Sequence, residues 1–529
     1  MPRAAALAFF VLLAIAHPWP RARRPAIYSR VDNGDYSLNV WAIDWVAHTL
    51  PTNPTNLFDA NIFHPERLTL AYSEPLLLQG ALAIPSVWAG ASPIATYSLV
   101  LLAGFALSGW AFALLAKRAT GSWIAGLVAG SAVAFNSHTL VRLVHIQALH
   151  LELVPLVFLA LDSLLATGRI RHAALLGAAL ALQVTQSIYL LVFTGWAALC
   201  AWLARWADWR QRLGMTAGWA LVAAVTCAVV LLPVIWPYAE LARRYGMVRE
   251  IGETQRCAAT WMDFLYTGSR LHYEAWASRF DNASDASFPG VIVTALAIVA
   301  VFGAGWRLPR TRMWAGVALG SLLLAFLPWL PGFAWLQAHV PPFSAIRCYS
   351  RAGQVMLVGM GMLAGFGAAR LLAGLRSVRA TAIAGAALVA AINVEAFRAP
   401  LGYREFEGVP RIYDRLRDEP HAVIVEMPFY ERGAFYGNAE YMVHATRHHH
   451  PMVNGYSGFT PPDYDATAEA MRTFPDYPAL ELMHRLGVTH VVVHLTRTME
   501  DRRAAIDASP ALRLWVEQGD IAIYRFVSR

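Results

Sequence analysis

The chain has 529 residues, of which 57% are hydrophobic and 15% charged, and its mean hydropathy is +0.42. An ordinary soluble domain carries about 25% charged residues, so the composition excludes a single soluble domain and predicts a polytopic membrane protein. The net charge of +8 comes from arginines in short segments between apolar runs. This placement follows the positive-inside rule and argues against a nucleic-acid partner.

The first apolar segment is residues 4–18. Ala14-Ile15-Ala16 fits a signal-peptide cleavage site, but we favour an uncleaved first span. In either case the next segment lies outside the membrane, although Arg21, Arg23 and Arg24 there depart from the positive-inside rule.

The outer loop that follows, residues 19–93, is rich in acids. Leu38, Trp41 and Trp45 recur at helical spacing, which predicts a helix lying in the membrane interface. The polar candidates along the loop are Asp32, Asp35, Asp44, His48, Asp59, His64, Glu66 and Glu74. Residues 74–89, interrupted by Pro85, predict a helix that is packed at the outer surface or re-entrant.

Ten further spans are predicted, which with the first gives about 11: 94–116, 122–136, 150–166, 172–186, 187–204, 214–236, 289–305, 313–329, 350–371 and 380–396. Each predicted interior turn is basic, as at Lys117 and Arg118 or at Arg307, Arg310 and Arg312. The pattern places the N-terminus in the cytoplasm and both the first loop and the C-terminus outside. Cys257 and Cys348 fall in the exterior segments 237–288 and 330–349, where a disulfide is one alternative.

Residues 399–529 predict an extracytoplasmic α/β domain, after a membrane domain over residues 1–398. Strands are predicted at 421–429, 488–494 and 521–526, and helices at 408–418, 464–473, 477–486 and 500–508. The run His448-His449-His450 predicts a loop and no metal site, because consecutive side chains point in different directions.

Each candidate site residue has a functional and a structural interpretation. Asp35 follows the Asn33-Gly34 turn and is either a general base or a helix N-cap, and Asp32 carries the same ambiguity. Glu74 is either a second functional acid or a residue that stabilises a helix start. His64 and Glu66 are expected to support the loop or an acceptor.

Two basic pairs lie at predicted exterior ends of spans. Arg142 and His145 are predicted to share a helix face, and Arg347 and Arg351 are predicted to lie one turn apart on one side. Either pair suits a phosphate, but interfacial polar residues and lipid headgroups explain such pairs equally well.

The segments NGDYSLNVWAIDW, LFDANIFHPERLTLAYSEPLL, VRLVHIQALHLELVPLVFLAL, AIRCYSRAG and PMVNGYSGFTPPDY together resemble bacterial members of the C-type (GT-C) superfamily of integral-membrane glycosyltransferases. The resemblance implies an α-helical membrane domain with a C-terminal soluble domain, polyprenyl-phosphate-linked sugar donors and inversion at the anomeric carbon. It also implies a catalytic acid at Asp35, with Asp32 as competitor and Glu74 near a second acidic position. Asp32 and Asp35 depart from the closer acidic pair of some members, so a Mg²⁺ or Mn²⁺ cofactor is left open and no metal ligand is assigned.

The prediction is therefore a glycosyltransferase of the bacterial inner membrane. Its expected partners are a polyprenyl-phosphate sugar, membrane lipids and a glycan, lipid or protein acceptor. The alternative is a non-catalytic transporter or lipid-binding scaffold with an extracytoplasmic receptor domain. A transporter should show repeated halves and ionisable residues near the middle of its spans, and the sequence shows neither.

Overall fold

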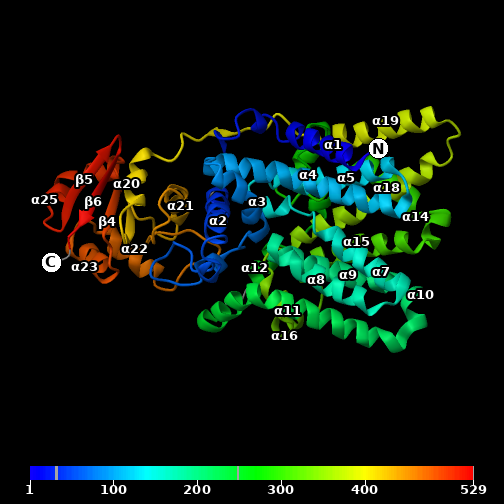
Figure 1. Ribbon diagram of the computed structural model, residues 1–529, viewed down its shortest axis with the longest axis horizontal. Helices are drawn as coiled ribbons and strands as arrows, with labels where there is room; N and C mark the ends of the chain where they lie inside the picture. The colour runs from blue at the N-terminus through cyan, green and yellow to red at the C-terminus, as the bar shows by residue number, and fades with distance from the viewer. Residues whose placement is uncertain (30–33, 247–249, 528–529) are drawn as a thin grey trace. The chain divides into compact units, whose positions relative to one another are not determined.

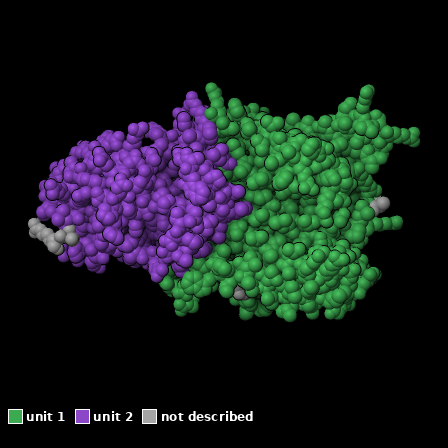
Figure 2. Space-filling view, viewed as in Figure 1, with its two compact units in different colours: residues 1–23, 100–402 green, residues 24–99, 403–529 purple. Residues whose placement is uncertain are grey.

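The computed structural model describes residues 1–29, 34–246 and 250–527. The chain forms two compact units. Unit 1 contains residues 1–23 and 100–402, and unit 2 contains residues 24–99 and 403–529 (Figure 2). Unit 2 therefore combines the first outer loop with the C-terminal region, whereas the sequence predicts a division at 398/399.

Unit 1 is built from helices. They are α1 (Arg3–Ala16), α4 (Pro93–Thr120, from Val100), α5 (Trp123–Ala134), α6 (Ser137–Val141), α7 (Val154–Thr167), α8 (Ile170–Gln186), α9 (Ile188–Ala204), α10 (Trp206–Trp209), α11 (Leu213–Tyr245), α12 (Ile251–Arg256), α13 (Arg270–Tyr273), α14 (Val291–Val301), α15 (Pro309–Phe326), α16 (Phe333–His339), α17 (Pro341–Ala345), α18 (Gly353–Leu372) and α19 (Val378–Ala396) (Figure 1).

The centre of unit 1 is α18, which packs against α5, α14 and α15. Small residues permit this close packing, as is common between membrane helices. A Cβ added to Gly361 would lie 2.7 Å from Val133, and one added to Gly365 would lie 2.7 Å from the Ala125 carbonyl. Helix α1 belongs to the same core, because Phe10 is fully buried against Gly109 and Gly130.

Five helical segments among the described residues are long and apolar enough to cross a membrane: Pro93–Thr120, Trp206–Tyr245, Pro309–Trp329, Tyr349–Leu372 and Val378–Ala396. The other six predicted spans each contain a helix of 11 to 17 residues. These helices are shorter than the roughly 20 residues that a straight span requires. Length and composition thus support five spans, and the total of about 11 remains a prediction.

Unit 2 contains a four-stranded sheet in the order β3-β4-β6-β5. Strands β3 (Ile424–Met427) and β4 (His490–His494) are parallel, and β5 (Leu512–Gln518) and β6 (Ile521–Phe526) form an antiparallel hairpin. The other elements are β1 (Tyr28–Ser29), α2 (Asp35–Thr49), α3 (Leu77–Trp88), β2 (Arg404–Glu405), α20 (Asp414–Arg417), α21 (Asn438–Ala445), α22 (Tyr464–Arg472), α23 (Tyr477–Arg485), α24 (Arg497–Glu500) and α25 (Arg503–Ala508), with the short 3-10 helices η3 (Thr69–Tyr72) and η11 (Arg411–Tyr413).

Helix α2 is in the interior of unit 2, where it packs against α3 and α21. Trp41 and Trp45 are 3% and 9% exposed. Their indole N–H groups donate to Asn61 Oδ1 and to the Leu57 carbonyl, each at 2.9 Å. The prediction that this face lies in the membrane interface is therefore wrong, because the loop after the helix and the C-terminal region cover it.

All three predicted strands are present, and the predicted helices 464–473 and 477–486 match α22 and α23 within one residue. The sequence prediction missed β5 and α21. Strands β1 and β2 pair antiparallel, Tyr28 with Glu405 and Ser29 with Arg404. This pairing joins the two separated segments of unit 2.

Candidate functional site

Asp35 is the first residue of α2, and Gly34 occupies the N-cap position with φ +104°. The N-cap interpretation of Asp35 is therefore wrong, because the left-handed conformation before the helix is taken by glycine. The Tyr456 hydroxyl donates a hydrogen bond to Asp35 Oδ1 at 2.7 Å. The carboxylate thus has a defined orientation at a helix N-terminus, where the helix dipole favours a negative charge.

Tyr456 is 7% exposed, and its ring contacts Phe435 at a centroid distance of 4.8 Å. It belongs to a segment that is held on both sides. On one side Ile424 donates to the Pro451 carbonyl and Val453 donates to the Ile424 carbonyl, so the segment extends beside β3. On the other side the backbone N–H groups of Phe63 and His64 donate to the carbonyls of residues 454 and 452. This pairing fixes the place from which the Tyr456 hydroxyl reaches Asp35.

The other candidates of the first loop have different surroundings. Asp32 lies outside the described residues. The His64 Nε2–H group donates to the Leu486 carbonyl at 3.2 Å, and burial lowers the pKa of His64. The Tyr72 hydroxyl donates to Glu66 Oε2 at 3.4 Å. Glu74 is partly buried and lies two residues before Leu76, which is the N-cap residue of α3.

In unit 1, Asp285 is the centre of a buried ionic cluster. Its carboxylate lies 2.9 Å from His138 Nδ1 and 3.0 Å from an Arg142 guanidinium nitrogen. Burial alone would raise the pKa of Asp285, but the charges of His138 and Arg142 hold it below its usual range. A second acid, Asp263, accepts hydrogen bonds from the backbone N–H groups of Asp285 and Thr260 and so fixes this loop.

Arg142 and His145 do not share a helix face, which corrects the sequence prediction. Helix α6 ends at Val141, and the His145 N–H donates to the Arg142 carbonyl at 2.9 Å, which closes a turn. Burial and the charges of Arg351 and Arg142 lower the pKa of His145. The structure therefore brings His145 near both arginines, as a neutral imidazole among cations.

Arg351 has a setting different from that of Arg142. Its guanidinium carbon lies 5.0 Å from the ring centre of Tyr189, and its Nε is buried. Among the residues that the structure describes, this Nε has no hydrogen-bond acceptor and the side chain forms no ion pair with an acid. A buried donor without an acceptor is energetically unfavourable, so the site suits an external anion.

Arg347 and Arg351 do not lie on one helical turn, as the sequence predicts. Arg347 precedes the short 3-10 helix Tyr349–Ala352 that contains Arg351, and it lies 3.9 Å from Glu253. The residue between them, Cys348, forms a disulfide with Cys257. This bond is the alternative that the sequence left open, and it joins the two predicted exterior segments of unit 1.

Buried polar residues support the turn that carries Arg142 and His145. His150 Nδ1 lies 2.8 Å from Glu152 Oε1, and the Ser108 hydroxyl donates to the Leu149 carbonyl at 2.9 Å. The side-chain amides of Gln186 and Gln354 donate to the carbonyls of residues 150 and 148. These contacts fix the turn against several helices of the unit.

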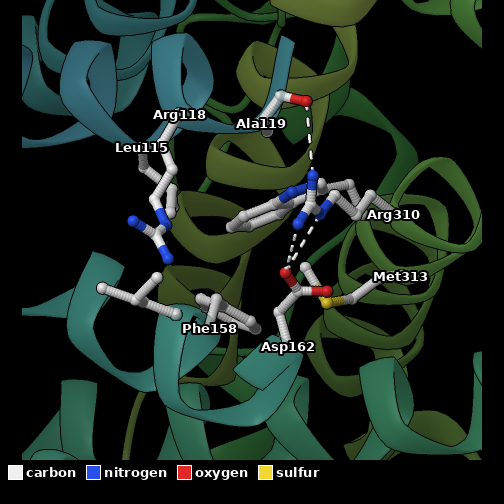
Figure 3. Close-up of a pocket in the computed structure, with 9 residues that line it drawn as sticks. Leu115, Arg118, Ala119, Phe158, Asp162, Arg310 and Met313 are labelled. Carbon is white, nitrogen blue, oxygen red and sulfur yellow. Dashed lines mark hydrogen bonds and ion pairs between the residues drawn. The ribbon is translucent and has the colours of Figure 1, made fainter. Parts of the chain in front are cut away.

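A pocket of about 290 Å³, counting open solvent, lies elsewhere in unit 1, between α4, α7 and α15. Arg310 spans it, donating to Asp162 and to the Ala119 carbonyl (Figure 3). Asp162 lies in the second half of α7, whereas the His150 turn precedes that helix. The pocket is therefore separate from the turn that carries Arg142 and His145. The ion pair between Arg310 and Asp162 joins α15 to α7.

The run His448-His449-His450 lies in a loop, as predicted. His449 Nε2 is 2.8 Å from Asp44, and the His450 Nε2–H group donates to the Leu416 carbonyl. A different group of three described residues, Glu426, His444 and His494, has donor atoms within 4.8 Å of one another and could hold a metal ion.

The sequence prediction missed Tyr456, Asp285 and Tyr189. Tyr456 lies within the quoted segment PMVNGYSGFTPPDY, so the resemblance pointed at the segment but not at the residue. No local pattern marks Asp285 or Tyr189, because their partners come from distant parts of the chain. Asp35 belongs to unit 2, whereas Arg142, His145, Arg347 and Arg351 belong to unit 1.

No protein-family model matches the sequence, and none of the curated proteins matches it. Solved structures do. The chain matches the mycobacterial arabinofuranosyltransferase AftD with a TM-score of 0.60 and 15% identity, over 100% of this chain and 40% of that one. Its R1389S mutant, class 2, gives a TM-score of 0.60, 16% identity and coverages of 100% and 41%. The chain therefore spans less than half the length of this protein.

A weaker likeness is to ArnT from Cupriavidus metallidurans, with a TM-score of 0.48 and 13% identity over 99% of this chain and 97% of that one. A score at this level does not establish a shared fold. The likeness to AftD does, and it shows that the chain shares the fold of the part of AftD that it matches.

Proposed function

From the fold shared with part of AftD and the GT-C resemblance of the sequence, we propose that the protein transfers a sugar from a polyprenyl-phosphate donor to an acceptor hydroxyl, on the outer face of a bacterial inner membrane. A fold by itself does not specify an activity. The observation that carries the proposal is Arg351, a partly buried cation without an acidic partner among the described residues. Such a group suits the phosphate of a lipid-linked donor.

The proposed reaction is a direct displacement. Asp35 takes the proton of the acceptor hydroxyl, and the acceptor oxygen attacks the anomeric carbon with inversion. The bond between that carbon and the phosphate oxygen breaks, and polyprenyl phosphate leaves with the bonding electrons. Tyr456 orients the Asp35 carboxylate, and Arg351 stabilises the negative charge that develops on the leaving phosphate.

The remaining candidates have supporting roles in this proposal. Arg142 is held by Asp285 and adds positive charge beside His145. Arg347, about half exposed and near Glu253, contributes less. Asp32 and Glu74 are the alternative bases, and His64 and Glu66 support the acceptor or the loop. The proposal allows a Mg²⁺ or Mn²⁺ cofactor and an acceptor that is a glycan, a lipid or a protein. Activity assays with each metal and each acceptor class test these two points.

The membrane orientation has two supports. The predicted interior turns are basic, which places the first loop and the C-terminus outside. The disulfide between Cys257 and Cys348 also suits an oxidising, extracytoplasmic side.

The test is release of free polyprenyl phosphate from a panel of polyprenyl-phosphate sugars by purified protein. We expect release by wild type and loss of about 100-fold or more in Asp35→Asn and Arg351→Gln, the size typical for a catalytic group. Asp465→Asn, an exposed acid paired with Arg432 in the same unit as Asp35, is the matched control and should retain activity.

Two results would contradict parts of the proposal. Full transfer by both Asp35→Asn and Asp32→Asn would show that neither is the base. Solute flux in proteoliposomes without donor consumption would favour the transporter alternative.

A further inference from the structure

Four polar side chains meet in the interior of unit 2, and the proposed reaction uses none of them. They are Tyr413 of η11, Glu426 of β3, His444 of α21 and His494 at the end of β4. Tyr413 and Glu426 are fully buried and His444 is 5% exposed. The His494 side chain is 13% exposed and gives the group one approach from solvent.

The fold explains why these residues meet. Glu426 is opposite Val492 in the parallel pairing of β3 with β4. Side chains alternate along a strand, so His494, two residues after Val492, is on the same face of the sheet as Glu426. Helix α21 and η11 supply the other two side chains. The His494 ring stacks on Tyr441 at a centroid distance of 4.6 Å, which fixes its orientation.

The donor atoms are at spacings that a small metal ion can bridge. Tyr413 Oη lies 2.8 Å from Glu426 Oε2, 3.2 Å from His444 Nδ1 and 3.2 Å from His494 Nε2. His494 Nε2 lies 2.6 Å from Glu426 Oε2. Four ligands at about 2.0–2.1 Å around Zn²⁺ are roughly 3.3 Å apart. The hydrogen-bonded pairs therefore need to open by less than about 1 Å to hold the ion, and the donor atoms of Glu426, His444 and His494 all lie within 4.8 Å of one another.

The charge of the group also indicates a cation. The structure gives Glu426 no arginine or lysine partner among the described residues, and its Oε1 is buried without a hydrogen bond there. A buried carboxylate is costly without a compensating charge.

We propose that Glu426, His444 and His494, with the Tyr413 hydroxyl beside them, bind one divalent transition-metal ion of the Zn²⁺ class. Two imidazoles with a carboxylate are a common zinc ligand set, whereas Mg²⁺ prefers oxygen ligands and keeps several waters. The four residues come from four separate elements, and the ion joins them, so its role is structural. The competing arrangement is a metal-free network in which Tyr413 and His494 both donate to Glu426.

The experiment uses the full-length protein in detergent, treated with a chelator and then titrated with Zn²⁺ alone. We expect each chain to bind about one zinc ion tightly. We also expect the melting temperature to rise when Zn²⁺ is added. Titration with Co²⁺ alone should give the visible absorption of a tetrahedral or five-coordinate ion. Glu426→Gln and His494→Gln should each lower the zinc affinity more than about 10-fold. Loss of a residue that only hydrogen-bonds to a metal ligand already lowers metal affinity by about 10-fold or more.

The matched control is His490→Gln, because His490 is a buried histidine on the same strand outside the group. It should bind zinc as wild type does. If chelator-treated wild type binds no zinc and gives no Co²⁺ spectrum, the metal-free network is correct and the proposal is wrong. Equal loss of binding in His490→Gln and His494→Gln would also overturn it. The wild-type titration decides the matter even if a variant fails to fold.

Discussion

Asp35 and Tyr456 are 421 residues apart in the chain and 2.7 Å apart in the structure. The resemblance pointed to Asp35 as a base, whereas Tyr456 could not be predicted, because a pairing at this separation leaves no local pattern. The same reason hides Asp285, which joins Arg142 and His138 across the unit. The sequence thus predicted which acidic and basic residues are candidates for the site. It did not predict the residues that they contact, because those contacts form only in the folded chain.

Tyr456→Phe removes only the hydroxyl that orients Asp35. A hydrogen bond to a charged group is worth about 1.5–3 kcal/mol, so we expect kcat to fall by about 10- to 100-fold with little change in KM for the donor. Tyr436→Phe, an exposed tyrosine of the same unit, is the control. A Tyr456→Phe enzyme that is indistinguishable from wild type would contradict the positioning role.

We expect His448 to make the stability of unit 2 depend on pH. Its Nδ1 accepts a hydrogen bond from the His450 N–H at 3.0 Å, and burial lowers the pKa of His448 well below its usual value. The unfolded chain takes up a proton near pH 6.5 that the folded chain does not bind, so stability should fall as the pH drops below about 6.5.

The slope that His448 contributes is at most about 1.4 kcal/mol per pH unit. Melting temperatures measured at about pH 7 and about pH 5 should therefore differ less in His448→Asn than in wild type. His421→Asn, an exposed histidine of the same unit, should keep the wild-type difference. An unchanged difference in His448→Asn would show that other groups cause the acid sensitivity.

At the scale of elements, the longer helices of unit 1 were predictable because apolar runs identify them, whereas short helices such as α12 and α16 were not predicted. Strand β6 was predicted to the residue, whereas β5, in which only the first of seven residues is buried, was missed. Helix α21 was missed because its buried face includes Tyr441 and His444, which do not form an apolar stripe. The geometry of Arg347 and Arg351 was mispredicted because the chain there is a loop followed by a 3-10 helix.

The disulfide between Cys257 and Cys348 closes a loop with a sequence separation of 91. Removing a native disulfide typically costs about 2–4 kcal/mol, so Cys348→Ser should lower the melting temperature of the protein measurably. Cys200→Ser, which changes a free cysteine of α9, should have a smaller effect. Reductant should lower the wild-type melting temperature and leave that of Cys348→Ser unchanged. The opposite pattern would show that the bond does not stabilise the fold.

At the scale of the whole molecule, the proposed orientation is testable by labelling. In a Cys200→Ser, Cys227→Ser background, a membrane-impermeant thiol reagent should label Asp281→Cys from outside intact spheroplasts. It should label Gln211→Cys, in a predicted interior turn, only after the membrane is opened. Labelling of Gln211→Cys in intact cells would contradict the orientation that the basic turns predict.

Unit 2 is the feature that sequence alone places least well, since residues 24–99 and 403–529 form one compact body. Hydrophobic and charge patterns are local, and both segments looked self-contained in the sequence. The pairing of β1 with β2 and the backbone contacts of residues 61–64 with 452–454 are what unite them.

This composition of unit 2 has a consequence for biosynthesis. A ribosome makes residues 24–99 early, but their partner strands and the Tyr456 segment emerge only after residues 100–402 have been translated and inserted. In the proposed orientation, the acidic loop would be outside the membrane during that interval, with Trp41 and Trp45 lacking the cover that the C-terminal segment supplies. In that orientation the nascent chain would expose this segment until synthesis is complete, which is the state that envelope chaperones and proteases would meet first.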